Sequence, residues 1–248
     1  ALNIVTKSGT NEFHGEGIYL IRPGGWQAEQ FSTNNFCPPS VATCIIPANL
    51  NGINAVDIPD KLQQFSGSIG GPVIKDKTFF FVSAEHTRQD RTTFLSSSLP
   101  SFLLPTNGKL EYTGHYRQEL ADARLDHRFT ERQNLMFRFN YDRFFDDNPQ
   151  DAVGGTNAPS VARRYSRTAW TVQANLTSVI SAELLNEARI AYLNGDPVTR
   201  WEAQNLSTTY VRGGGNSSVP FTIGQSRSSD LWSRQIQLSD TLSWTTGR

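Results

Sequence analysis

The stretch that decides the fold runs from Asn134 to Phe145 and reads NLMFRFNYDRFF. Leu135, Phe137, Phe139 and Tyr141 occupy alternate positions, and Met136, Arg138, Asn140 and Asp142 fall between them. Successive side chains of a β-strand point to opposite faces, so apolar residues that recur every second position gather on one face. The stretch therefore predicts a strand with one apolar face and one mainly polar face.

Similar stretches lie on both sides of this one. The preceding residues 121–128 read ADARLDHR, and residues 129–133 between the two are short enough to connect a hairpin. Taken together, the alternating segments predict about eight strands and an all-β, antiparallel fold. The expected strands are 12–22, 63–74, 78–87, 121–128, 134–145, 169–176, 187–192 and 235–244. Asp240 interrupts the apolar face of the last strand.

Links between these strands alternate in length along the chain. The links at 75–77, 129–133 and 177–184 are short. The others are long and rich in Gly, Pro, Asn and Ser, namely 23–61, 88–116, 146–164 and 194–228. Outer-membrane β-barrels place long loops outside the cell and short turns in the periplasm. The order of the links therefore favours a segment of a transmembrane β-barrel, with about eight strands in this chain.

Composition is compatible with this reading. The 248 residues hold 23 Lys and Arg against 23 Asp and Glu, so no net charge attracts a nucleic acid. No segment approaches the roughly 18 consecutive apolar residues of a membrane-spanning helix. A barrel strand needs only about 9–11 residues and shows an apolar side chain at every second one, so low hydropathy does not exclude a barrel.

The two faces of the strands predict two environments. Charged and polar side chains suit a hydrated lumen, whereas apolar and aromatic side chains suit lipid. The residues expected to face the lumen are Asp122, Arg124, Asp126, Arg128, Arg138, Asn140, Asp142, Gln173, Glu187 and Arg189. Those expected to face lipid are Leu135, Phe137, Phe139, Trp170, Val172, Leu176, Ile190 and Tyr192.

Cys37 and Cys44 lie close together in a Pro-, Asn- and Ser-rich stretch of the first long link. Such a pair in an oxidising compartment favours a disulfide that closes a small surface loop, while two free thiols are the alternative. Their spacing and the lack of a nearby His argue against a metal site.

Two further segments resemble a known family. Residues 3–15, which read NIVTKSGTNEFHG, resemble the junction between plug and barrel in TonB-dependent receptors of the Oar-like type. Residues 65–81, which read FSGSIGGPVIKDKTFFF, resemble the second and third barrel strands of the same family and the turn between them. These receptors usually carry an N-terminal carboxypeptidase-regulatory-like domain.

The resemblance implies a division of the chain and a function. Residues 1–11 would end the plug domain and form the junction, and residues 12–248 would form the N-terminal part of a barrel of about 22 strands. It implies an outer membrane of the Gram-negative type, contact with outer-membrane lipid, a TonB complex reached through upstream residues, and energy-coupled passage of a solute or secreted substrate. Siderophore, glycan, peptide and secreted protein all fit as cargo.

Enzymatic signals are weak, and no cofactor is expected. The four histidines are scattered without metal-ligand spacing, and no GxSxG nucleophile motif occurs. We expect a protein that is not an enzyme. Two alternatives share parts of the pattern: a surface β-sandwich that binds carbohydrate or protein, and a passive porin without a plug.

Overall fold

The structure, a computed structural model, describes residues 7–24, 60–95, 103, 111–147, 153–201, 209–211, 221–224 and 228–245. Seven long strands follow one another along the chain, each hydrogen-bonded to the next. They are β1 (His14–Arg22), β2 (Lys61–Ile74), β3 (Thr78–Phe94), β4 (Glu111–Thr130), β5 (Gln133–Asp147), β6 (Arg163–Val179) and β7 (Leu184–Trp201). An eighth position is filled by β10 (Ser229–Asp230) and β11 (Ser233–Trp244), which both pair with β7.

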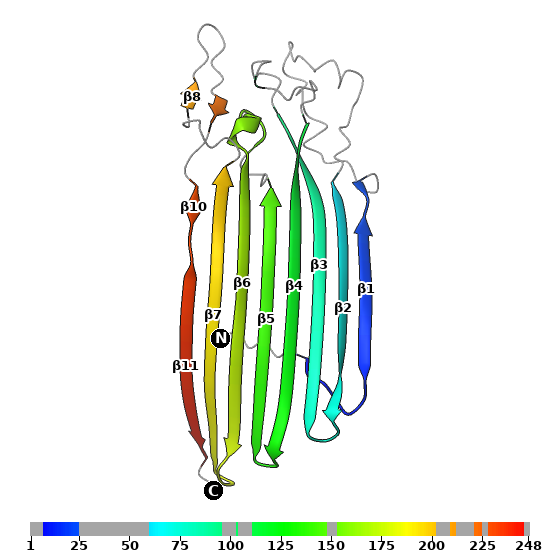
Figure 1. Ribbon diagram of the computed structural model, residues 1–248, viewed down its shortest axis with the longest axis vertical. Coiled ribbons are helices and arrows are strands. Elements are labelled where there is room, and N and C mark those ends of the chain that lie inside the picture. Colours follow the sequence, from blue (N-terminus) through cyan, green and yellow to red (C-terminus); the bar gives the residue numbers. More distant parts are fainter. Residues whose placement is uncertain are drawn as a thin grey trace.

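These strands form one curved antiparallel sheet with β1 at one edge and β10 and β11 at the other (Figure 1). The prediction of an all-β, antiparallel fold with about eight strands is confirmed. The described residues contain no second sheet packed face to face on this one; the small hairpin of β8 (Thr209–Val211) and β9 (Phe221–Ile223) lies beyond the strand ends. The architecture therefore lacks the dry interlayer core that defines a β-sandwich.

The short links all lie at the same end of the strands, as predicted. Lys75, Asp76 and Lys77 form the turn between β2 and β3, where the Lys77 amide donates to the Ile74 carbonyl at 3.1 Å and Asp76 has a φ of 61°. A second turn joins β4 to β5 at residues 131–132, and a third joins β6 to β7 at residues 180–183. The strand ends that lead into the long links all lie at the opposite end of the sheet, which we call the long-link end (Figure 1).

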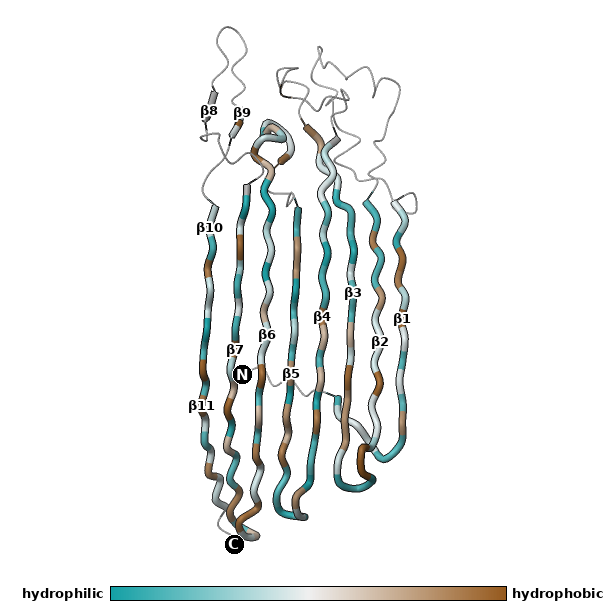
Figure 2. Tube along the Cα trace, in the orientation of Figure 1, coloured by the Kyte–Doolittle hydropathy of each residue, from teal (hydrophilic) through white to brown (hydrophobic). Residues whose placement is uncertain are grey.

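At the long-link end, several strands extend further than the sequence predicted. β3 continues to Phe94 and β4 begins at Glu111, and the two pair without interruption over 17 positions. β7 likewise continues to Trp201. At 20 residues, β4 has about twice the length that a strand needs to cross a membrane. The extensions of β3 and β4 are mainly polar on both faces, so hydrophobic periodicity gives little sign of them (Figure 2).

Few side chains are buried, and most of the buried apolar ones lie near the long-link end of the strands. Leu95, Val153, Val161 and Ala162 form a small buried cluster, against which Leu103 and Tyr112 pack. We call these six residues the rim cluster. A 3-10 turn, η4 (Pro159–Val161), brings Val161 into it. Residues 146–164 are one of the long links predicted from the sequence, and part of this link is buried.

Backbone hydrogen bonds hold the same link in place. The Gly155 amide donates to the Phe94 carbonyl at 2.7 Å, and the Ala158 amide donates to the Thr222 carbonyl at 2.9 Å. The link between β5 and β6 is therefore tied both to the end of β3 and to the hairpin of β8 and β9. No helix among the described residues has the length and apolarity to cross a membrane.

Candidate functional site

The pairing register separates the side chains into two faces. Asp122 on β4 lies opposite Ser83 on β3 and Asn140 on β5, and Asn140 lies opposite Thr171 on β6. Directly opposed residues of paired strands lie on the same face of the sheet. We call the face that carries Asp122 the inner face, and the other the outer face.

All ten residues expected to face a lumen fall on the inner face, and all eight expected to face lipid fall on the outer face. The pairing register separates the two sets. A shift of one strand by a single residue would move each of its side chains to the other face. Which environment covers each face stays a prediction. Cys37 and Cys44 lie outside the described residues, as does most of the first long link.

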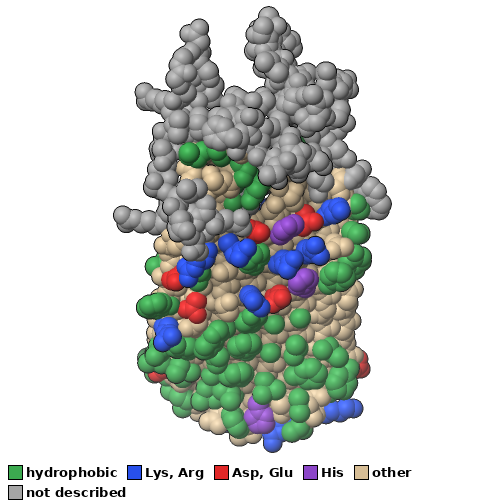
Figure 3. Space-filling model, turned by 45° about the horizontal axis from the view of Figure 1, so that its top comes forward, with side chains coloured by type: hydrophobic (Ala, Val, Ile, Leu, Met, Phe, Trp, Pro, Cys, Tyr) green, Lys and Arg blue, Asp and Glu red, His purple; other side chains and the backbone are tan. Residues whose placement is uncertain are grey.

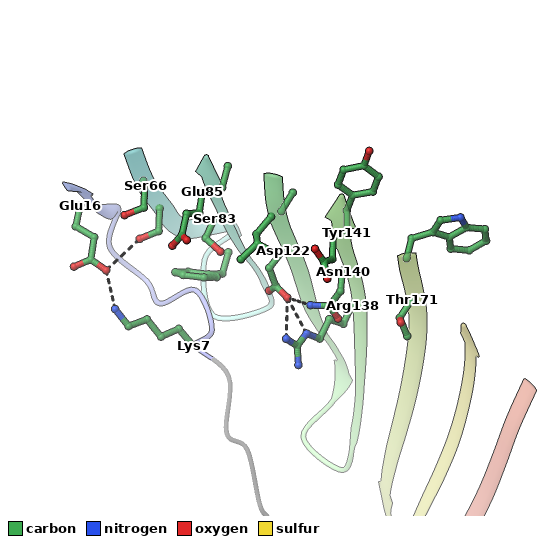
Figure 4. Close-up of a pocket in the computed structure, with 18 of the residues that line it drawn as sticks. Lys7, Glu16, Ser66, Ser83, Glu85, Asp122, Arg138, Asn140, Tyr141 and Thr171 are labelled. Atoms are coloured by element: carbon green, nitrogen blue, oxygen red, sulfur yellow. Dashed lines mark hydrogen bonds and ion pairs between the residues drawn. The ribbon is translucent and has the colours of Figure 1, made fainter. Parts of the chain in front are cut away.

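A hollow of about 620 Å³ lies on the inner face (Figure 4). It extends from β1 to β6, and the segment that precedes β1 also contributes to its wall. Polar groups dominate the labelled side chains, which are Lys7, Glu16, Ser66, Ser83, Glu85, Asp122, Arg138, Asn140, Tyr141 and Thr171. The hollow is open on one side, so a solute could reach these groups directly.

Asp122 is the centre of the first hydrogen-bond network in this hollow. Arg138 donates to its carboxylate from Nε at 3.0 Å and from Nη2 at 2.8 Å, and Asn140 donates to the same oxygen. The side chains of Arg138 and Asp122 are 25% and 19% exposed. Partly buried, charge-assisted contacts of this kind are stronger than those on an open surface.

A second hydrogen-bond network lies nearer the long-link end of the strands. Asp142 accepts from Gln118 at 3.1 Å and from Arg167, and the Tyr116 hydroxyl donates to Gln118 at 2.7 Å. Arg91 lies over the Tyr116 ring, 4.5 Å from its centroid. These contacts join four neighbouring strands, β3 to β6, through side chains as well as through their backbones.

Two other ion pairs form within a single strand instead of between strands. Arg124 pairs with Asp126 at 2.8 Å on β4, and Arg189 pairs with Glu187 at 3.0 Å on β7. Residues two positions apart share a face, so their side chains can meet along the strand. The charges of the inner face therefore pair both across strands, as Asp122 does with Arg138, and along a single strand.

Several members of the hollow were not identified from the sequence, and Lys7 and Glu16 form an ion pair among them. Lys7 precedes β1, and its Nζ lies 2.9 Å from Glu16 Oε1; Ser68 is within 3.5 Å of the same oxygen. Glu16 stands between Gly15 and Gly17, so no alternating row of charges marks its strand. The only available signal was a single carboxylate in a strand expected to pair with a serine-rich neighbour.

The chemistry of the inner face is that of hydrogen bonding. Carboxylates there lie beside cations, as Asp122 does with Arg138 and Glu16 with Lys7. The described residues include no group of three His, Cys, Asp or Glu side chains arranged to hold a metal ion. The wall can therefore offer many donors and acceptors to a polar solute without a strong net field.

Comparison with known proteins gives one family and one related structure. The family model described as an outer membrane beta barrel domain matches residues 5–115 and 107–248. The crystal structure of the outer membrane transporter YddB from Escherichia coli superposes with a TM-score of 0.59 at 12% identity. That alignment covers 95% of this chain and 28% of the YddB chain, so this chain spans under a third of that protein. No curated protein matches the sequence.

Proposed function

Since the chain belongs to the outer membrane beta barrel domain family, and so to a protein of the outer membrane, we propose that it forms part of a TonB-dependent receptor. In this proposal the inner face lines the passage, and the complete protein binds a solute or secreted substrate and moves it across the membrane with energy supplied through TonB. Residues 1–11 are the end of the plug and its junction, and residues 12–248 are barrel wall. The role is transport and not catalysis.

One observation carries the proposal: the segment before β1 packs on the inner face of the sheet. The salt bridge between Lys7 and Glu16 holds it beside the wall of the hollow (Figure 4). Asn11 then reaches the turn between β2 and β3, where its Oδ1 accepts from the Asp76 amide at 2.8 Å. A plug must be connected to its barrel from within the lumen, and this segment follows such a course.

Close packing of Gly9 supports the same course. A Cβ on Gly9 would lie 2.8 Å from the Gly71 carbonyl oxygen, 2.9 Å from the Phe80 amide nitrogen, and closer still to the Phe80 carbonyl oxygen. Only glycine allows the backbone to approach the wall this closely. The motif that resembles the plug–barrel junction thus coincides with a close contact between the segment before β1 and the sheet, which supports the proposal.

A conductance experiment separates this proposal from a passive porin, which would share the wall but lack a plug. The full-length protein is incorporated into planar lipid bilayers, beside a variant that lacks all residues upstream of Gly9. We expect no steady open conductance from the full-length protein and stable open steps from the truncated variant. Stable open steps from the full-length protein would contradict the plugged arrangement.

Energy coupling needs a separate test in cells. Uptake of fluorescently labelled siderophore, oligosaccharide and peptide probes is measured in cells that express the full-length protein, with and without TonB. We expect at least one probe to accumulate only when TonB is present. Accumulation that is equal in the absence of TonB would overturn the energy-coupled part of the proposal while leaving the barrel wall intact.

A further inference from the structure

The outer face changes character sharply along its strands. Its half nearer the short turns is covered by apolar side chains, and a belt of charged side chains lies directly beyond them (Figure 3). On β5 the apolar row ends at Tyr141 and the next outer-face residue is Arg143. On β6 the apolar row ends at Trp170, and the next outer-face residues are the polar Thr168 and Ser166.

Aromatic rings mark the boundary between the two zones. The Trp170 and Tyr192 rings lie 5.3 Å apart, and the Tyr19 and Phe65 rings stack at 4.5 Å. Tyr and Trp collect where hydrocarbon meets lipid headgroups. The first charged residues lie two positions beyond these rings, or about 7 Å further along the strands, and so at the height of the headgroups.

The belt holds an excess of positive charge at one place. Arg88 on β3 lies directly opposite Arg117 on β4, and Arg143 on β5 lies diagonally from Arg117. Like charges at directly opposed positions destabilise a sheet unless something neutralises them. Glu119, at 3.9 Å from Arg143, is the nearest described carboxylate to that guanidinium. In the described parts of the chain, no carboxylate pairs with Arg88 or Arg117.

Two other basic side chains of the belt have carboxylate partners. His115 lies 2.9 Å from Asp90, and Arg200 is bound by Asp230. The Arg200 guanidinium holds the pKa of the Asp230 carboxyl below its usual value, so that pair stays ionised near neutral pH. These two side chains therefore have carboxylate partners, unlike Arg88 and Arg117 among the described residues.

A groove of about 430 Å³ lies beside these arginines. It is lined by Arg117, Glu119, Arg143, Phe144, Phe145, Ser166 and Thr168. Guanidinium groups bind phosphate through two parallel hydrogen bonds, and hydroxyls can donate to its remaining oxygens. The outer-face side chains just below the groove, such as Phe139 and Val172, are apolar and suit acyl chains.

We propose that Arg88, Arg117 and Arg143 bind the phosphate of an outer-leaflet lipid whose acyl chains lie against the apolar zone beneath them. Charge complementarity selects a phosphate, and the continuity of the groove with the apolar zone selects a lipid phosphate over a free anion. The lipid neutralises the opposed arginines and fixes the height of the barrel in the membrane.

Lipid binding by the full-length protein in detergent tests the proposal. The probes are diphosphorylated lipid A, the same lipid after enzymatic removal of its phosphates, and inorganic phosphate as a competitor. Binding is measured by native mass spectrometry for the wild type, the double variant R117Q/R143Q, and R132Q as a matched control at the periplasmic turn. Heat-dependent migration on gels confirms that each variant is folded.

We expect the wild type and R132Q to retain diphosphorylated lipid A, and R117Q/R143Q to bind it at least about tenfold more weakly. The lipid without phosphates should bind all three proteins equally weakly, and millimolar inorganic phosphate should not displace the intact lipid. Equal binding of both lipids by the wild type, unchanged binding by the double variant, or full displacement by inorganic phosphate would each overturn the proposal.

Discussion

Replacing Phe137 with Arg tests the assignment of the outer face to lipid. Phe137 lies between Leu135 and Phe139 on the outer face of β5, directly opposite Leu125 on β4 and Ala174 on β6. The residue is 41% exposed, so a large part of its ring faces whatever surrounds the sheet. An arginine at this position would have apolar neighbours on both adjacent strands.

The magnitude follows from the depth of the site. At about 3.4 Å per residue, Phe137 lies about 7 Å along the strand from Leu135 and about 14 Å from Tyr141, inside the apolar zone. Arginine on the lipid face of a barrel costs about 2–4 kcal/mol near the midplane and about 0–1 kcal/mol near the interfaces. We expect F137R to lower the free energy of unfolding by about 2–3 kcal/mol, roughly a 30- to 150-fold change in the folding equilibrium.

Urea unfolding of the full-length protein in lipid vesicles, followed by tryptophan fluorescence, measures this change. The matched control is M136R, because Met136 is the next residue on the strand and lies on the inner face opposite Asp126. There the new guanidinium would meet a carboxylate and water, and we expect a change below about 1 kcal/mol. A larger loss from M136R than from F137R would show that the two faces are assigned the wrong way round.

Three further outcomes are expected. Asp122→Ala should lower the free energy of unfolding by about 1–2 kcal/mol, since Arg138 loses its carboxylate; a double-mutant cycle with Arg138→Ala checks the coupling, which would be near zero if the pair contributed nothing. Gly9→Ala should loosen the segment before β1, because its Cβ would meet the backbone of the wall; limited trypsin digestion should then cut that segment faster than in the wild type, and equal rates would refute the close packing. Titration of thiols in the native protein should find Cys37 and Cys44 unreactive until a reductant is added, and immediate reaction of both would rule out the disulfide.

The central strands could be predicted because two independent signals agree in them. In β5, apolar residues alternate with polar ones over its whole middle, and a short link on one side fixes which strand it pairs with. Once the alternation and the hairpin are known, the register follows and determines which residues share a face. The two sets of side chains on β4, β5, β6 and β7 could therefore be separated from sequence alone.

Other features depend on contacts that the local sequence does not encode. The ends of β3 and β4 are mainly polar on both faces, so only their mutual pairing reveals them as strands. The rim cluster joins Leu95 to Val153 and Val161, residues scattered through two different links. Asp126 had candidate partners on its own strand and on the next, and the choice of Arg124 depends on side-chain geometry.

The extension of β3 and β4 beyond the apolar zone has a consequence for the timing of local motion. Their residues there are paired at every position to Phe94 and Glu111, so alternate backbone amides are hydrogen-bonded, although both faces of this region are mainly polar. Exchange of an amide hydrogen with solvent requires the strand pair to open, whether or not lipid covers it. Slow hydrogen exchange should thus continue well outside the lipid-covered zone and end only near the rim cluster, so the mouth of the wall would open on the timescale of a folded sheet and not on that of a loop.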